Sequence, residues 1–377
     1  MMSASLTAKT EEKKRIRQTQ GTQRFLNPAS DSISFSDNDY LGLSRHSGVA
    51  EAAIRAIHDA GTSARAARHL AGSCREHAAL EKALADWKGT EAALVFSSGY
   101  QTPLGIIPSL VGPQDTVLLE RNAHACLFDG AKLSGARLRL FLRNSQTSLE
   151  EALLLTQKLN PEGKILVVAE SLHSMDGDFL EIETLVELKE KYGAWLLLDE
   201  AHANGVIGPA GTGWAAERGL MDRIDIQMGT LGKSLGSSGG FVAASSEAIE
   251  HFLNEARTFL FGTAPAPAAM AAAAKALQIL SSAEGENLRK QLKKNILLYA
   301  SLHLNSRQGP VQPWILKSND GTVQARDLLL ARGIDVAAIR PPTVPEGSAR
   351  LRISLSARHS EAEVQRLAEE LKRLPVE

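Results

Sequence analysis

The sequence predicts an α/β fold built around a mostly parallel sheet. Short runs of Val, Leu and Ile alternate along the chain with longer segments in which apolar residues recur every three or four positions. The short runs are continuously apolar, which is typical of strands buried on both faces of a parallel sheet. Strands that alternate with helices in this way form doubly wound α/β domains. The 377 residues suffice for two or three domains.

The elements are expected in the following order. Residues 1–46 form an N-terminal arm, with a short helix and then an extended segment. Residues 47–270 form a large domain, in which Gly193 ends the helix that begins near residue 182. Seven strands are predicted there, at residues 92–96, 116–119, 138–142, 165–169, 195–198, 224–228 and 241–244.

A smaller C-terminal α/β domain is expected over residues 271–377, because the pattern changes after Pro265 and Pro267. Long helices without intervening strands come first, and short strands and helices alternate after them. The predicted elements are helices at 268–280 and 287–304, short elements at 314–316, 327–331, 334–338 and 351–355, and a last helix at 361–371.

Composition and charge exclude several classes of protein. Lys plus Arg is 42 and Asp plus Glu is 43, a formal net charge of −1, whereas proteins that hold nucleic acid or anionic membranes by bulk charge carry a basic excess. The apolar runs fall far short of the roughly 20 residues of a membrane span, and residues 1–20 are polar and show no signal peptide. Two cysteines build no disulfide framework or zinc finger, and the histidines lack paired ligand spacing. We therefore expect a cytoplasmic enzyme without a metal, a nucleic-acid partner or a membrane partner.

Three motifs that follow predicted strands carry the candidate chemistry. Lys233 is the only charged residue between Ile226 and Ser246, and a desolvated lysine is an amine nucleophile that can form a Schiff base. Asp199 ends a buried strand, where open α/β sheets bind ligands, and His202 follows it.

The third motif is the Ser98-Gly99-Tyr100 turn between a strand and a helix, a place where free N–H groups bind anions. Each motif has an ordinary structural explanation by itself: a surface lysine, a turn aspartate, a tight turn. Together they fall on one edge of one sheet. An amine, a carboxylate and a phosphate cradle match the aldehyde, ring nitrogen and phosphate of pyridoxal 5'-phosphate.

A nucleoside-triphosphatase is the remote alternative. Residues 199–202 read Asp-Glu-Ala-His, and Gly232-Lys233-Ser234 resembles the end of a phosphate-binding P-loop. The P-loop pattern, however, requires a glycine where this chain has Gln227. The order of the two motifs is also reversed, and the neutral charge balance does not favour a nucleic-acid track.

Taken with their order and spacing, these motifs resemble the α-oxoamine synthases over residues 35–371. The matching segments are Asn-Asp-Tyr-Leu-Gly at 38–42, Ser98 to Tyr100, His124, Ser-Met-Asp-Gly-Asp at 174–178, Asp199 with His202, and Thr230 with Lys233. The resemblance implies the aminotransferase-like fold (pyridoxal-phosphate fold type I), pyridoxal 5'-phosphate as cofactor, and a homodimer with shared active sites.

The resemblance also implies a role for each matching residue. Lys233 would hold the cofactor and act as the base, Asp199 would keep the ring nitrogen protonated, and His124 would stack on the ring. The catalytic set would be Lys233, His124 and His202. His202 and Ser174 would reach the ring oxygen, while Thr263 would come from the partner subunit. The phosphate would be bound around Ser98, Gly99, Tyr100 and Thr230, and the substrate by Asn38, Arg340 and Arg352.

Within the family, residues 338–345 and 350–353 resemble the members that join L-alanine to a pimeloyl thioester in biotin synthesis, with loss of CO₂ and of the carrier. The carrier, coenzyme A or acyl carrier protein, stays open. So does a sister reaction that uses glycine or serine. Arg65, Arg68 and His69 stand where we expect fewer charges, and they would either contact the acyl donor or form a solvated face.

Overall fold

The computed structural model describes residues 5–24, 26, 31–302 and 306–375. Contacts divide the chain into two compact units. Unit 1 comprises Met1–Asp37, Asn295–Leu355 and His359–Glu377, and unit 2 comprises Asn38–Lys294 and Ser356–Arg358. The domain bounds expected from the sequence stay a prediction.

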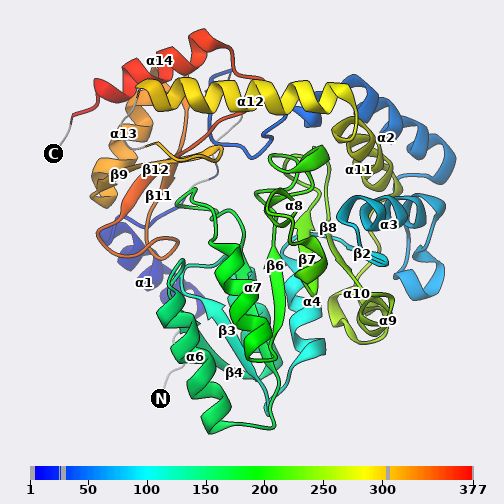
Figure 1. Ribbon diagram of the computed structural model, residues 1–377. Coiled ribbons are helices and arrows are strands. Elements are labelled where there is room, and N and C mark those ends of the chain that lie inside the picture. The colour runs from blue at the N-terminus through cyan, green and yellow to red at the C-terminus, as the bar shows by residue number, and fades with distance from the viewer. Residues whose placement is uncertain (1–4, 25, 27–30, 303–305, 376–377) are drawn as a thin grey trace. The chain divides into compact units, whose positions relative to one another are not determined.

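Unit 2 contains the predicted seven-stranded, mostly parallel sheet (Figure 1). Its spatial order is β2-β8-β7-β6-β5-β3-β4, and only β8 runs antiparallel to its neighbours. The strands are β2 (Ala92–Phe96), β3 (Thr116–Glu120), β4 (Arg137–Phe141), β5 (Ile165–Glu170), β6 (Trp195–Asp199), β7 (Ile226–Thr230) and β8 (Gly240–Ala244). Strands β2 and β7 both run antiparallel to β8, so β2 runs in the same direction as β6 and β7. The C-terminal ends of β2, β6 and β7 therefore lie at the same edge of the sheet.

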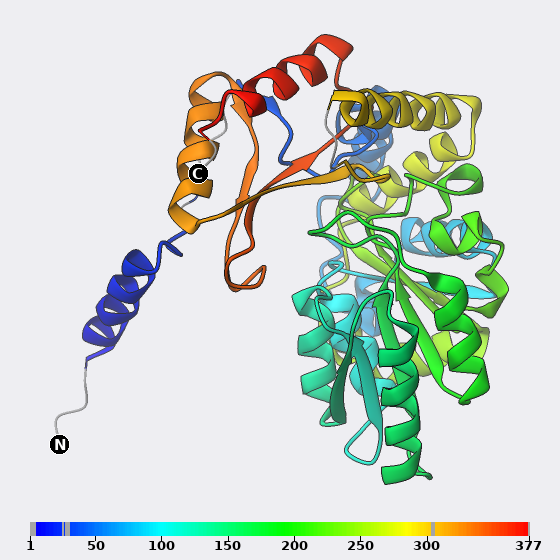
Figure 2. The same cartoon turned by 60° about the vertical axis from the view of Figure 1, so that its left-hand side comes forward.

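Helices cover both faces of this sheet, as its continuously apolar strands require. One buried cluster packs α4, α5, α9 and α10 against the sheet, and a second packs α6 and α7 against the opposite face (Figure 2). The helices of unit 2 are α2 (Ser47–Ala60), α3 (Arg75–Lys88), α4 (Gln101–Leu110), α5 (Ala125–Ser134), α6 (Gln146–Leu159), α7 (Ile182–Lys191), α8 (Trp214–Glu217), α9 (Ser246–Glu255), α10 (Arg257–Leu260) and α11 (Pro267–Leu280). Helix α12 (Ala283–Leu302) begins in unit 2, and its residues from Asn295 on belong to unit 1.

The long helices expected after the sheet are present. Helix α11 begins at Pro267, a residue suited to the first helical turn because it has no N–H to leave unpaired. Helix α12 begins at Ala283, four residues before the predicted start, and its predicted end at Leu304 lies outside the described residues.

Unit 1 holds the N-terminal helix and the short C-terminal elements. Helix α1 (Leu6–Thr19) and strand β1 (Ile33–Ser34) precede β9 (Val311–Lys317), α13 (Asn319–Ala331), β10 (Ile334–Asp335), β11 (Ala337–Ile339), β12 (Ala349–Ser354) and α14 (Glu361–Lys372). The run predicted at 334–338 is two strands, because β10 pairs with β1 whereas β11 joins β12 and β9 in an antiparallel sheet. Residues 327–331 are the end of α13.

Among the described residues, no helix is long and apolar enough to cross a membrane.

Candidate active site

A cavity of about 160 Å³ lies in unit 2, at the edge where β2, β6 and β7 end. Seven residues that the sequence singled out line it. They are Gly99, Tyr100, His124, Asp199, His202, Thr230 and Lys233. Glu170, Cys126, Ala201, Met228 and Gly229 complete the wall.

Lys233 lies in the loop between β7 and β8, and its ammonium group contacts the imidazole of His202. The Lys233 Nζ to His202 Nε2 distance is 2.7 Å. On its other side, His202 Nδ1 lies 2.6 Å from the hydroxyl of Tyr40. The nucleophile expected from the sequence is thus held at a defined place in the cavity.

The structure of the loop that carries Lys233 argues against the nucleoside-triphosphatase alternative. A P-loop connects a strand to a helix whose N-terminus faces the phosphates. Here the loop connects two antiparallel strands, β7 and β8. Gly232-Lys233-Ser234 therefore resembles a P-loop in sequence but not in structure.

Asp199 ends β6 opposite Glu170, the last residue of β5. Burial, reinforced by the negative charge of Glu170, raises the pKa of Asp199 to about 7, although Lys233 and the backbone N–H of Ala201 favour its ionised form. A buried carboxyl group with this pKa is poised to be ionised by a cation placed against it.

His124 caps the N-terminus of α5 and keeps a neutral ring. Its Nδ1 accepts a hydrogen bond from the backbone N–H of Cys126 at 3.3 Å and contacts the Cys126 thiol at 2.9 Å. Burial and the positive charge of Lys233 lower the pKa of His124, against the opposing charge of Glu170. Burial also raises the pKa of Cys126, so its sulfur stays a thiol. An uncharged imidazole at the wall suits stacking on an aromatic ring.

The turn from β2 into α4 meets the end of β7, where the sequence predicts an anion cradle. A Cβ built on Gly99 would come within 3.0 Å of the Thr230 side chain. The Thr230 hydroxyl donates to Gly239 O and accepts from the backbone N–H of Gly232. Gly99 thus leaves its backbone open to a group that approaches Thr230.

Four other predicted residues lie in unit 2 without lining the cavity. Ser98 uses its hydroxyl to cap α4 at Gln101 N. Ser174 is buried and donates its backbone N–H to Glu170 Oε2. Asn38 Oδ1 accepts from the Tyr40 hydroxyl, and Thr263 O accepts from Ser97 Oγ.

The two candidate substrate arginines belong to unit 1. Arg340 donates to the backbone carbonyls of Gly21 and Gln23. Burial, together with the neighbouring positive charges of Arg326 and Arg24, lowers the pKa of Arg340. Arg352 is buried on β12 and donates to Ser354 Oγ at 3.0 Å.

Glu170 is a site residue that the sequence motifs did not predict. Its carboxylate accepts from the backbone N–H of His124 at 2.8 Å and from that of Ser174 at 3.0 Å, so it joins two segments that carry predicted site residues. Glu170 N in turn donates to Glu120, which forms a buried ion pair with Arg143. The sequence does contain a signal for this role, because Glu170 ends the apolar strand β5 just as Asp199 ends β6.

The charges at 65–69 have structural partners in part. Arg68 forms a bidentate ion pair with Glu81, with nitrogen–oxygen distances of 2.7 and 2.9 Å. The His69 Nε2 lies 2.8 Å from Leu253 O, and the ring of His69 meets Phe259 edge-on. Arg65 is exposed at φ 70°.

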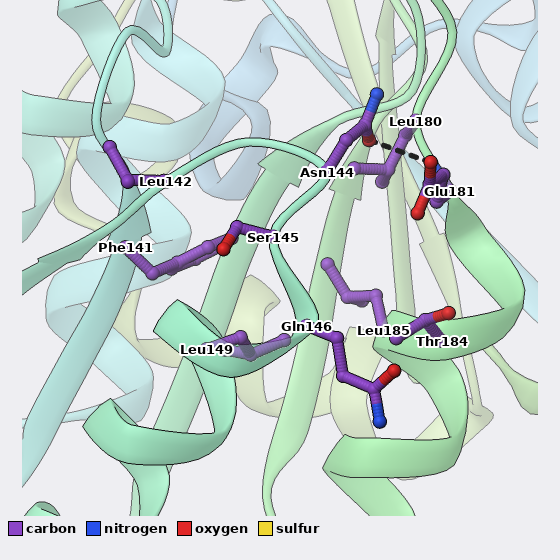
Figure 3. Close-up of a pocket in the computed structure, with 10 residues that line it drawn as sticks. All are labelled: Phe141, Leu142, Asn144, Ser145, Gln146, Leu149, Leu180, Glu181, Thr184 and Leu185. Atoms are coloured by element: carbon purple, nitrogen blue, oxygen red, sulfur yellow. Dashed lines mark hydrogen bonds between the residues drawn. The ribbon is translucent and has the colours of Figure 1, made fainter.

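Two other features of the described residues do not form a site for a metal or a cofactor. His173, Asp176 and Asp178 lie close enough to share a metal ion. However, Arg143 already pairs with Asp178, and the hydrogen bond to Asp176 raises the pKa of His173 to about 9 despite its burial, so that it is itself a cation there. The crevice between β4, α6 and α7, where Asn144 accepts from the Glu181 backbone, measures about 20 Å³, too small for a cofactor (Figure 3).

The residues around the cavity at the ends of β2, β6 and β7 fit pyridoxal 5'-phosphate. Lys233 offers an amine to the aldehyde, Asp199 a carboxyl group to the ring nitrogen, and His124 a neutral face to the ring. The glycine turn beside Thr230 offers backbone N–H donors to the phosphate. The chemistry of the donor set therefore matches each handle of this molecule.

Known proteins similar to the chain point the same way. The pattern of the class I and II aminotransferases matches residues 30–371. Curated proteins named 8-amino-7-oxononanoate synthase are 40% identical in Geobacter sulfurreducens, over 95% of this chain and 93% of that protein, and 41% identical in Nitrosococcus oceani, over 90% of each.

Solved structures agree in fold. Serine palmitoyltransferase from S. paucimobilis with bound PLP–myriocin aldimine superposes with a TM-score of 0.91 at 28% identity, over 98% of both chains. The 8-amino-7-oxononanoate synthase from Francisella tularensis gives 0.74 at 25% identity, over 91% of this chain and 97% of that one. The chain belongs to the class I and II aminotransferase family and, within it, to the α-oxoamine synthases.

Proposed function

We propose that the chain is an 8-amino-7-oxononanoate synthase. The enzyme joins L-alanine to a pimeloyl thioester and releases CO₂ and the thiol carrier, a step of biotin biosynthesis. One observation carries the proposal: Lys233, Asp199 and His124 surround a single cavity in a chain about 40% identical to proteins of that name.

When bound, pyridoxal 5'-phosphate supplies an electron-withdrawing ring that stabilises negative charge on the substrate carbon. Lys233 would hold the cofactor and, as a free amine, would move the proton at the alanine Cα. Asp199 would keep the ring nitrogen protonated, His124 would lie against the ring, and His202 would hydrogen-bond the ring oxygen.

The remaining residues bind and orient the ligands in this proposal. Ser98, Gly99, Tyr100 and Thr230 surround the phosphate, and Ser174 supports the ring-oxygen side. Asn38, Arg340 and Arg352 bind substrate, with the Arg352 guanidinium on the alanine carboxylate.

The proposed assembly is a cytoplasmic homodimer in which each protomer lends Thr263 to its partner's site. Coenzyme A or acyl carrier protein delivers the acyl group. The unpaired thiols Cys74 and Cys126 are consistent with a reducing compartment.

A sister reaction with serine or glycine is the second candidate, favoured by the TM-score of 0.91 with serine palmitoyltransferase. The deciding experiment offers L-alanine, glycine or L-serine with pimeloyl-CoA to the purified protein and measures thiol and CO₂ release. We expect turnover with alanine; faster turnover with glycine or serine would overturn the proposal.

Lys233→Ala tests the proposed base in the same assay. Since general base catalysis contributes about 10²–10⁴-fold, we expect at least that loss of turnover, together with loss of the bound cofactor's absorbance. The control is Lys82→Ala, which removes an exposed lysine paired with Asp86. Full turnover in Lys233→Ala would refute the assignment.

A further inference from the structure

Two hydrogen bonds connect Lys233 through His202 to Tyr40, and a third continues from Tyr40 to Asn38. Lys233 Nζ lies 2.7 Å from His202 Nε2, His202 Nδ1 lies 2.6 Å from Tyr40 Oη, and Tyr40 Oη lies 3.0 Å from Asn38 Oδ1. Tyr40 is 1% exposed and His202 7%. The hydrogen bond between His202 and Tyr40 is therefore shielded from solvent, where the direction of a hydrogen bond matters most.

The direction of the bonds follows from the lysine end. An ammonium group has three N–H donors and no acceptor, so His202 Nε2 must accept from a charged Lys233. A neutral imidazole then carries its single hydrogen on Nδ1. Nδ1–H then donates to the Tyr40 oxygen, which lies 2.6 Å away.

The tyrosine end gives the same direction independently. A phenol has one hydrogen, and the Tyr40 hydroxyl donates it to Asn38 Oδ1. Its oxygen is then left to accept from His202 Nδ1. The lysine end and the tyrosine end of this series of hydrogen bonds therefore give the same arrangement of hydrogens.

We propose that Tyr40 is a positioning residue that keeps the hydrogen of His202 on Nδ1 and so turns the Nε2 lone pair towards Lys233. The inference rests on the proposed role of Lys233, but the hydrogen bonds belong to the protein without cofactor. Tyr40 thereby fixes the place of the Lys233 amine and favours its charged form until it reacts. Asp199, Glu170, His124, Cys126 and Tyr100 are further titratable groups that line the same cavity.

The test is the imidazole nitrogen NMR spectrum of the full-length, cofactor-free protein with ¹⁵N-labelled histidine, at pH 8. His202→Gln assigns the resonances of His202. We expect Nδ1–H in the wild type and a shift towards Nε2–H in Tyr40→Phe, which removes the acceptor. Tyr192→Phe, which removes a hydroxyl bonded to Glu150 outside the cavity, should leave the His202 signals unchanged.

A second variant guards against misfolding of Tyr40→Phe. Asn38→Leu removes the acceptor for the tyrosine hydrogen, which then becomes free to donate to Nδ1, so it should also shift His202 towards Nε2–H. Nε2–H in the wild type would overturn the proposal. So would an unchanged tautomer in the folded variants.

The second readout is the rate at which cofactor-free protein combines with added pyridoxal 5'-phosphate, followed by absorbance against pH. In Tyr40→Phe the charged lysine loses its acceptor, so the profile should move to lower pH, whereas Tyr192→Phe should keep the wild-type profile. A profile that does not move contradicts the proposal. Neither readout involves alanine or a thioester, so an error in the proposed substrates would leave both results intact.

Discussion

Asp199 and Glu170 place two carboxyl groups at neighbouring strand ends in one cavity wall. Burial and the charge of Glu170 raise the pKa of Asp199 to about 7, whereas an unfolded aspartate titrates at about 3.9. Between these values the folded protein binds more protons than the unfolded chain, so this group makes the protein less stable as pH rises through the window.

Asp199→Asn should remove that dependence from the cofactor-free protein. Relative to the variant, the wild type should lose about 1–3 kcal/mol of unfolding free energy between pH 4 and pH 8, less than the roughly 4 kcal/mol of the full shift. Thermal unfolding of both proteins at matched concentration measures it. A constant difference in stability across this range would contradict the prediction.

Glu170→Gln should loosen two segments of the site at once. The carboxylate accepts from His124 N and Ser174 N, and an amide turns one of these contacts into a clash of donors. A buried unpaired N–H costs about 1–3 kcal/mol, which should lower both stability and affinity for the cofactor. Cofactor titration and thermal unfolding check this, with Glu162→Gln on the surface as control. Wild-type values for both would mean that Glu170 does not hold these segments.

At the scale of elements, the strands were predictable because each is one apolar run bounded by a turn. The predicted bounds of β2 agree with the structure, and those of β7 lie two residues early because the run ends in Gly229 and Thr230. The placement of Asp199 and Lys233 was also predictable, since parallel strands end at a common edge. The pairing of Glu120 with Arg143, and the splitting of residues 334–338 between two sheets, depend on register between distant segments, which local patterns do not encode.

The strand–turn–helix element β2–α4 carries its own prediction. Because a Cβ at Gly99 would stand 3.0 Å from the Thr230 side chain, Gly99→Ala should fill part of the cradle. Overpacking of this kind costs about 1–3 kcal/mol, so the dissociation constant for pyridoxal 5'-phosphate should rise about 5- to 150-fold. Fluorescence titration measures it. Gly112→Ala, where nothing lies within 4 Å of the added carbon, is the matched control; equal affinities would argue against a cradle here.

For the whole molecule, a net charge of −1 fits an enzyme of small substrates whose positive groups are placed locally. Several large apolar side chains are exposed on the surface. Phe261 is 72% exposed, two residues from Thr263, and Leu70 is 79% exposed. Single exposed apolar side chains are common on protein surfaces, but Phe261 lies close in sequence to the residue that the proposed homodimer would share between subunits.

Phe261→Glu should therefore weaken the dimer. A charge buried at an apolar contact costs about 2–4 kcal/mol, which raises the dimer dissociation constant about 30- to 1,000-fold. Light scattering after size-exclusion chromatography should give about twice 40.5 kDa for the wild type and a dilution-dependent fall towards 40.5 kDa for the variant. Leu154→Glu, on the exposed face of α6, is the control and should keep the wild-type mass. If Thr263 completes the partner's site, turnover should fall together with the mass; a variant that stays dimeric and active would place Phe261 outside the interface.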